Sequence, residues 1–235
     1  MGSSSLDFER PSKPRNGWRS LPFFDRQKHR HEELIRWYGI RKDIEPLASE
    51  LYTPLRLCPP GRVKVVLFAQ EPYRVYGPGV NDGIPYSVKY GAEKIPVPAR
   101  NLMAEYQDDL GFREPRWPNL KPWCENGVLM LYNSWIVRQG DSRALRFHYD
   151  SEPLTYDIFR RVNEYNPGCV FMFLGAGSKK WLPNVDTKKH AVIQTAGPTD
   201  GGQHLLSDVP PFRGSHVFTE TSKLLGVSKD MWRLP

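Results

Sequence analysis

Short apolar runs alternate along the chain with longer stretches in which apolar residues recur at helical spacing. The run "VKVVLF" at residues 63–68 is rich in β-branched residues and predicts a buried strand. The stretch "PARNLMAEYQDDLG" predicts a helix, with Pro98 near its start and Gly111 after its end. The same reasoning predicts further strands at 127–137, 169–175 and 190–195, helices at 152–166 and 215–226, and one or two helices within 30–52.

The order of these elements predicts the fold class. Strands that are apolar along nearly their whole length and separated by helices are typical of a parallel sheet covered on both faces. We therefore predict an α/β fold, a three-layer α/β/α sandwich around a central four-stranded parallel sheet. A chain of 235 residues is long enough for one substantial core, so we expect one domain over residues 21–235. Residues 1–20 are polar and without period, and we expect them to form a flexible basic leader.

The ends of the predicted strands carry the candidate chemistry. Ligands of such sheets bind beyond the carboxyl ends of the strands. All four strand ends bear polar or glycine-rich segments, namely Gln70–Arg74, Tyr132–Ser134, Gly175–Ser178 and Thr195–Thr199. Each segment taken singly is typical of an ordinary loop, whereas four together favour one shared cleft.

Composition narrows the classes of function. A net charge of +7 and a pI near 9.3 favour a polyanionic partner. No apolar run approaches 18 residues, the N-terminus lacks the apolar centre of a secretory signal, and the three cysteines form no CxxC pair. We therefore expect no membrane span, no metal, no cofactor and an intracellular location, in the cytoplasm or nucleus. A dinucleotide enzyme is disfavoured because GxGxxG is absent after the first strand.

Several motifs carry a resemblance to a known family. The segments "VKVVLFAQEPYR" and "GPGVNDGIPYSV" resemble the water-activating motif of family 1 uracil-DNA glycosylases. The similarity continues through "GVLMLYNSWIVR", "KKHAVIQTAGPT" and "PFRGSHVFTETSKLL", in the family's order, from about Leu51 to Leu225. Members of this family flip a base out of the DNA and cut the bond between base and sugar. The resemblance implies a monomeric, hydrolytic DNA glycosylase without metal, acting on single- or double-stranded DNA.

The resemblance also assigns the residues of a base-binding pocket. Gln70 corresponds to a residue that contributes a main-chain contact, and Tyr73 to the tyrosine that crowds position 5 of the pyrimidine. Tyr86 stands where the family stacks a phenylalanine on uracil. Asn133 is the candidate for the asparagine that reads the uracil edge, although an ungapped alignment places Tyr132 there. A shift of one residue in a strand turns a side chain to the opposite face, and a bulge would restore Asn133.

Two catalytic positions depart from the family pattern. Glu71 replaces the aspartate that positions water and stabilises the positive charge developing on the sugar. Its extra methylene matters, because a misplacement near 1 Å can cost on the order of a hundredfold in rate. Gly197 replaces the histidine that donates a hydrogen bond to the departing base, a loss that typically costs about 2.7–4 kcal/mol. His204 is a candidate to fill the gap, with an exposed loop position as the alternative.

The resemblance further implies a grip on the DNA backbone. A leucine wedge enters the base stack in this family, and Leu205 or Leu206 corresponds to it. Backbone N–H groups at the start of the final helix suit phosphate. The residues expected to contact DNA are Ser87, Gly175, Ser178, Lys179, Pro198, Thr199, Leu205, Leu206, Arg213 and Ser215.

Three functions stay open at this point. The leading hypothesis is a glycosylase that removes uracil or a related pyrimidine, with Glu71 in the place of the aspartate. A glycosylase retuned to a modified pyrimidine such as 5-hydroxymethyluracil is the second, because the absence of the histidine enlarges the pocket. A non-catalytic member that binds DNA or a protein is the third, suggested by Glu71 and Gly197 together. The sequence identifies no protein partner.

Overall fold

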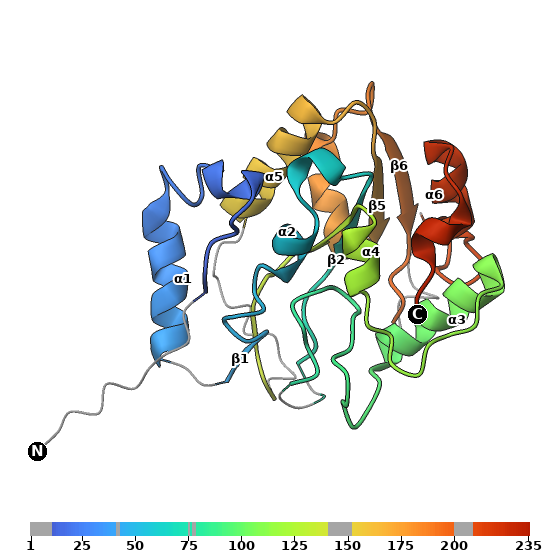
Figure 1. Ribbon diagram of the computed structural model, residues 1–235, viewed down its shortest axis with the longest axis horizontal. Helices are drawn as coiled ribbons and strands as arrows, with labels where there is room; N and C mark the ends of the chain where they lie inside the picture. The colour runs from blue at the N-terminus through green and yellow to red at the C-terminus, as the bar shows by residue number, and fades with distance from the viewer. Residues whose placement is uncertain (1–10, 41–42, 75, 77–78, 141–151, 200–208) are drawn as a thin grey trace, which may run out of the picture.

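The computed structural model describes residues 11–40, 43–74, 76, 79–140, 152–199 and 209–235. A four-stranded parallel sheet lies at its centre, in the order β3-β2-β5-β6 (Figure 1). Its strands are β2 (Val65–Ala69), β3 (Val128–Tyr132), β5 (Val170–Leu174) and β6 (Ala191–Thr195). The predicted α/β class and the central parallel sheet are therefore confirmed.

Helices and short 3-10 turns surround this sheet. The α-helices are α1 (Lys28–Ile40), α2 (Thr53–Leu57), α3 (Val97–Leu110), α4 (Lys121–Glu125), α5 (Glu152–Tyr165) and α6 (Val217–Leu225). The 3-10 helices are η1 (Gly17–Ser20), η2 (Pro60–Arg62), η3 (Ala176–Asn184) and η4 (Lys229–Trp232). Among the described residues, no helix is long and apolar enough to cross a membrane.

The alternation of side chains along the strands divides the core into two layers. In β2, Val66 and Phe68 face one hydrophobic cluster, whereas Val65 and Leu67 face the other. Residues of α1 and α5 join the first cluster, and residues of α3, α4 and α6 join the second. Figure 1 shows α1 and α3 at opposite sides of the molecule. Both faces of the sheet are thus covered, as a buried parallel sheet requires.

The strand predicted at 127–137 is too long. β3 ends at Tyr132, and the chain then turns, with the Ser134 hydroxyl donating to the Ile136 carbonyl at 3.0 Å. Val137–Arg138 forms a separate strand, β4, which pairs antiparallel with β1 (Ile44–Glu45). The apolar sequence continues through this turn because Trp135 and Ile136 are themselves buried, so hydrophobicity alone does not mark the end of the strand.

Residues 11–20 differ from the flexible leader expected over residues 1–20. Trp18 in η1 is 0% exposed, and its indole N–H donates to the Cys58 carbonyl at 2.7 Å. Asn16 caps η1 by accepting the Trp18 backbone N–H, and its amide donates to the Leu55 carbonyl at 2.7 Å. Trp18 belongs to the packed core and ties this part of the segment to it.

The parallel register brings the strand ends to one edge. Ala69 lies beside Tyr132, and Leu174 lies beside Thr195. Backbone hydrogen bonds continue the pairing beyond the strands, from Asn133 N–H to the Ala69 carbonyl at 2.8 Å and from Gly175 N–H to the Thr195 carbonyl at 2.9 Å. The loops that follow β2, β3, β5 and β6 therefore leave the sheet at the same edge.

Candidate active site at the carboxyl edge of the sheet

The loops at this edge touch one another. The side chain of Gln70 packs on Gly177, where an added Cβ would meet its Oε1 at 3.3 Å. Gly197 lies against Gly175, with 3.6 Å between an ideal Cβ on Gly197 and the Gly175 Cα. The Ser134 N–H donates to the Gln70 carbonyl at 3.0 Å. The structure thus brings together the four polar segments that the sequence predicts at the strand ends.

Glu71 lies two residues beyond β2 at this edge. Its Oε1 forms an ion pair with Arg74 Nη2 at 2.6 Å, and the two side chains are 24% and 25% exposed. A carboxylate held by a guanidinium in this way has a defined position and partial access to water. The same positive charge weakens the field that the carboxylate exerts on a neighbouring cation.

Tyr73 is fixed by contacts that the sequence does not reveal. The buried amide of Asn81 accepts the Tyr73 N–H at 2.8 Å and donates to the Tyr73 carbonyl at 2.9 Å. The same amide donates to Glu45 of β1 at 3.2 Å, and burial raises the pKa of that carboxyl group. Glu45 and Asn81 therefore act as positioning residues for the loop. No local sequence signal indicates their contact, because 36 positions separate them.

Three tyrosines form a buried group next to this loop. Tyr73, Tyr86 and Tyr132 are 8%, 9% and 3% exposed, and burial raises the pKa of each phenol. The rings are close enough that Tyr86 and Tyr132 both act on the pKa of Tyr73. The Tyr73 hydroxyl is buried and has no hydrogen-bond partner among the described residues. All three phenols consequently stay neutral at physiological pH and can donate a hydrogen bond.

Asp82 holds the turn that carries Tyr86. Its buried carboxylate accepts the Ser87 hydroxyl at 2.7 Å, the Asn119 amide at 3.1 Å and the Ile84 N–H at 3.2 Å. Tyr86 has a φ of 62°, a left-handed conformation that costs roughly 1–2 kcal/mol for a residue with a side chain. The surrounding hydrogen bonds offset this strain and orient the ring of Tyr86.

The two candidates for reading the base lie on opposite faces of the sheet. Tyr132 packs in the same hydrophobic cluster as Tyr86, and the parallel register is unbroken up to it. The side-chain oxygen of Asn133 accepts the indole N–H of Trp181 at 2.8 Å, and Trp181 belongs to the opposite cluster. The bulge that would bring Asn133 beside Tyr86 is not formed. Tyr132, and not Asn133, therefore lies on the side of the sheet that carries Tyr86.

Gly197 is buried directly after β6 and faces Gly175. His204, Leu205 and Leu206 lie outside the described residues. Pro198 is buried and its carbonyl accepts the Asn101 amide at 3.2 Å, whereas Thr199 is exposed.

Most of the residues expected to grip DNA are engaged within the protein. Ser87 is fully buried, and its hydroxyl donates to Asp82 and accepts the Leu120 N–H at 3.0 Å. The buried hydroxyl of Ser178 donates to the Gly175 carbonyl at 2.6 Å. Burial of both side chains argues against direct contact with phosphate. Lys179 is half-buried, and Ser215 donates to the Phe212 carbonyl at 2.5 Å.

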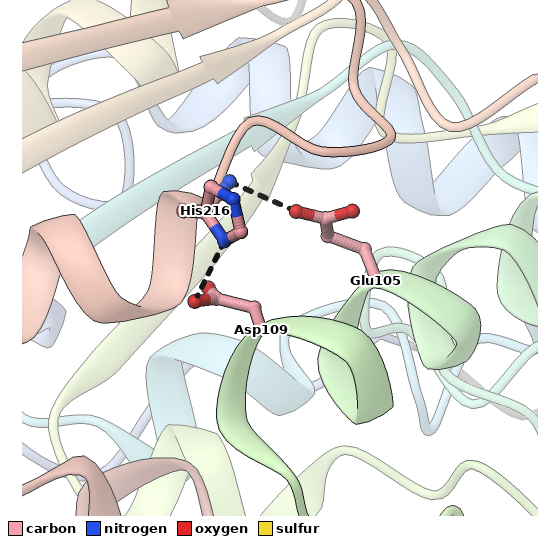
Figure 2. Close-up of side chains that lie close together, drawn as sticks. All are labelled: Glu105, Asp109 and His216. Atoms are coloured by element: carbon pink, nitrogen blue, oxygen red, sulfur yellow. Dashed lines mark hydrogen bonds and ion pairs between the residues drawn. The ribbon is translucent and has the colours of Figure 1, made fainter.

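Figure 2 shows how α3 holds the start of α6. Asp109 Oδ2 accepts the N–H groups of Phe218 and Thr219 at 2.9 and 3.0 Å. Glu105 accepts the His216 N–H at 2.9 Å and the Gly214 N–H at 2.6 Å. Two carboxylates thus stabilise the helix N-terminus. They also take the backbone donors that we expected to bind phosphate.

The same cluster is the arrangement of ligand atoms closest to a metal site in the described part of the chain. The ligand atoms of Glu105, Asp109 and His216 lie within 4.8 Å of one another, with His216 Nδ1 3.5 Å from Asp109 Oδ1. Arg213 pairs with Asp108 and lies 3.8 Å from Glu105. Arg213 and four backbone N–H groups already engage these acids, so the described contacts account for the cluster as the cap of α6.

Comparisons with known proteins show the family to which the chain belongs. A scan against protein-family models finds no match. The uracil-DNA glycosylase of Alkaliphilus metalliredigens is 31% identical over 198 residues, which cover 82% of each chain. The uracil-DNA glycosylase of Enterococcus faecalis is 30% identical over 228 residues, covering 94% of this chain and 96% of the relative. That of Deinococcus deserti is 33% identical over 198 residues, covering 82% and 75%.

Solved structures show the same fold at lower identity. The crystal structure of mimivirus uracil-DNA glycosylase has a TM-score of 0.76 at 20% identity, covering 88% of this chain and 81% of that one. Its Y322F variant in complex with UGI has a TM-score of 0.80 at 20% identity, covering 94% and 89%. Since curated relatives are at least 30% identical over most of both chains, this chain belongs to the uracil-DNA glycosylase family.

Proposed function

We propose that this protein is a DNA glycosylase that hydrolyses the bond between the sugar and a flipped-out uracil or closely related pyrimidine. The observation that carries the proposal is a partly exposed carboxylate, Glu71, at the strand edge beside a group of buried tyrosines. Curated relatives named uracil-DNA glycosylase support the same reaction. Aromatic side chains next to one anionic side chain suit a pyrimidine whose sugar gains positive charge as the bond breaks.

The reaction follows from these positions. The everted base stacks on Tyr86 and abuts Tyr73, while Glu71 orients a water molecule toward the sugar carbon. The bond from this carbon to the base nitrogen breaks, and the base leaves with the electron pair. Positive charge on the sugar is stabilised by the Glu71 carboxylate, and the attacking water forms the new carbon–oxygen bond. The proton of the water passes to Glu71 and then to solvent.

Arg74 sets the effectiveness of Glu71 in this scheme. The ion pair at 2.6 Å fixes the longer glutamate side chain, which otherwise has more rotamers than aspartate. It also spreads part of the carboxylate charge onto the guanidinium, which reduces stabilisation of the sugar cation. We propose that Arg74 compensates for the extra methylene of Glu71 at some cost in charge stabilisation.

Tyr132 takes the role of reading the base edge. Its phenol is neutral because burial raises its pKa, so it offers one hydrogen bond as donor or acceptor. A carboxamide offers a donor and an acceptor side by side and can distinguish uracil from cytosine at both atoms. With Tyr132 the discrimination rests on one hydrogen bond and on shape.

The test is release of bases from defined oligonucleotides. Single-stranded substrates carrying uracil, 5-hydroxymethyluracil, thymine or cytosine are incubated with the protein, and abasic sites are revealed by alkaline cleavage. Uracil release that disappears in Glu71→Gln supports the proposal. Glu33→Gln removes an exposed acid from α1, outside the strand-end loops, and is expected to retain activity.

Other outcomes select the remaining hypotheses. Release of 5-hydroxymethyluracil without release of uracil supports a retuned enzyme, which the unfilled position at Gly197 favours. Tight, salt-sensitive DNA binding without any abasic product supports a non-catalytic member. Undiminished uracil release by Glu71→Gln contradicts the assigned role of Glu71.

A further inference from the structure

A groove lies beside α3, outside the strand-end loops. It encloses about 520 Å³ and is lined by Arg100 and Met103 of α3 and by Arg113, Pro115 and Arg116 of the segment that follows. The three arginines are exposed, and none forms an ion pair within the described part of the chain. Glu114 is the acidic residue in the lining, so the groove carries a net positive charge.

Aromatic surface continues this groove at one end. Pro115 and Arg116 also line a neighbouring hollow of about 180 Å³, together with Tyr90 and Trp117. The side chain of Tyr90 is 65% exposed. The Arg116 guanidinium lies 4.2 Å from the centroid of the Trp117 ring. An exposed ring such as that of Tyr90, next to guanidinium groups without an ion pair, is the combination that binds unpaired bases and their phosphates.

The position of the groove connects it to the candidate active site. Asn101 follows Arg100 on α3, and its amide donates to the Pro198 carbonyl in the loop after β6. The groove therefore begins one residue away from a direct contact with the strand-end loops.

We propose that this arginine groove, with the hollow at Tyr90 and Trp117, binds single-stranded DNA next to the nucleotide whose base is removed. The inference rests on the proposed function for its placement of the reacting nucleotide. Unpaired guanidinium groups match phosphate in charge and geometry. The exposed ring of Tyr90 favours a single strand over a duplex, because bases stacked within a duplex present no free face to it.

Binding of labelled oligonucleotides without uracil tests the groove apart from the chemistry. The triple variant Arg100→Gln, Arg113→Gln, Arg116→Gln is compared with a control triple variant, Arg19→Gln, Arg26→Gln, Arg36→Gln. The control loses the same charge from exposed positions in η1, in α1 and between them, on the other side of the molecule (Figure 1). Each phosphate contact contributes about 0.7 to the slope of log affinity against log salt for a single strand. We expect the groove variant to lower that slope by about 2, and affinity by roughly tenfold or more at 0.1 M salt. The control is expected to change neither.

Tyr90→Ala tests the choice of a single strand. Because one stacked base is lost, we expect Tyr90→Ala to bind a single strand at least roughly fivefold more weakly than the wild type. Binding of a duplex of the same length is expected to be unchanged. Equal losses by the groove and control variants overturn the proposal, as does wild-type affinity in the groove variant. Unchanged single-strand binding by Tyr90→Ala overturns the single-strand assignment. Poly-glutamate at an equal concentration of charge serves as a competitor. If it displaces DNA from the wild type but not from the groove variant, the groove binds an acidic peptide instead.

Uracil release separates failure of this inference from failure of the proposed function. On an oligonucleotide with one or two nucleotides on each side of uracil, the groove variant is expected to match the wild type. On a long oligonucleotide the wild type is expected to have a lower KM than the variant, with equal kcat. Absence of uracil release by the wild type on both substrates contradicts the proposed function and leaves the binding result to decide the groove.

Discussion

Replacement of Gly197 by histidine is expected to accelerate release of uracil. The backbone at this position accepts a side chain, because Gly197 is not among the glycines with a left-handed φ. An ideal Cβ would lie 3.6 Å from the Gly175 Cα, 3.9 Å from the Gly175 nitrogen and 4.0 Å from Thr199 Oγ1. These are ordinary van der Waals distances, so a Cβ at position 197 needs no movement of Gly175 or Thr199.

The expected gain follows from the hydrogen bond that the ring would add. A donor aimed at an oxygen that becomes negative in the transition state is typically worth about 2.7–4 kcal/mol, or about 10²–10³-fold in rate. Fixing the side chain in one rotamer costs up to about 1 kcal/mol. We therefore expect Gly197→His to raise the single-turnover rate by about tenfold to several hundredfold.

Single-turnover kinetics with a uracil-containing oligonucleotide measure this rate without interference from product release. Gly197→Ala is the matched control, since it adds the Cβ without the ring and is expected to leave the rate within about threefold of wild type. Thermal unfolding of both variants checks that the loop still packs against Gly175. A correctly folded histidine variant that is no faster than the alanine variant would refute the assignment of Gly197 to the leaving-group position.

Three further predictions address specificity, capping and pH dependence. Tyr132→Asn is expected to increase the ratio of the rates on uracil and cytosine by at least about tenfold, since one discriminating hydrogen bond is worth about 1.5 kcal/mol. A ratio that the substitution leaves unchanged would contradict this. Asp109→Ala removes the cap of α6 at a cost of about 0.5–2 kcal/mol, which lowers the Tm by about 1–8 °C in a thermal scan; an unchanged Tm would contradict the capping role. Burial lowers the pKa of His31 to about 4 from 6.5, so its contribution to stability is complete above pH 6.5 and is lost as the pH falls toward 4. Denaturant titrations of wild type and His31→Gln at pH 7 and pH 4.5 are expected to show the larger loss in wild type, and parallel losses would contradict this role of His31.

The parallel sheet was accessible from the sequence because each strand is a short apolar run. β2, β3 and β5 are buried along their whole length and β6 is mostly half-buried, and the hydrophobic runs stop at polar residues or glycine. The end of β3 was predicted too late because Trp135 and Ile136 remain apolar after the strand has ended. The hydrophobic period and the composition of a segment report how buried it is. The turn after β3 depends instead on local hydrogen bonding, which they do not report.

The contacts that support the candidate site could not be predicted from the sequence in the same way. Glu45 reaches Asn81 across 36 positions, and Asp109 reaches Phe218 across 109. Each of these acids is ordinary in its own segment, and its role depends on which elements the fold brings together. Ser87 illustrates the converse, because its motif suggested contact with DNA while the fold turns its hydroxyl toward Asp82.

Tyr132 and Asn133 lie on opposite sides of the sheet because successive side chains of a strand alternate. The indole N–H of Trp181 donates to Asn133 on one side, and Tyr132 packs in the same cluster as Tyr86 on the other. A strand alternates with period two, so bringing Asn133 beside Tyr86 would require a bulge and loss of this contact. Substitution at position 132 changes the group beside Tyr86 without either cost. Tyr132 and Gly197, the positions where the resemblance implies a departure from the family pattern, thus lie on an intact sheet edge, and we expect their effects on base recognition and on the departing base to be separable by single substitutions.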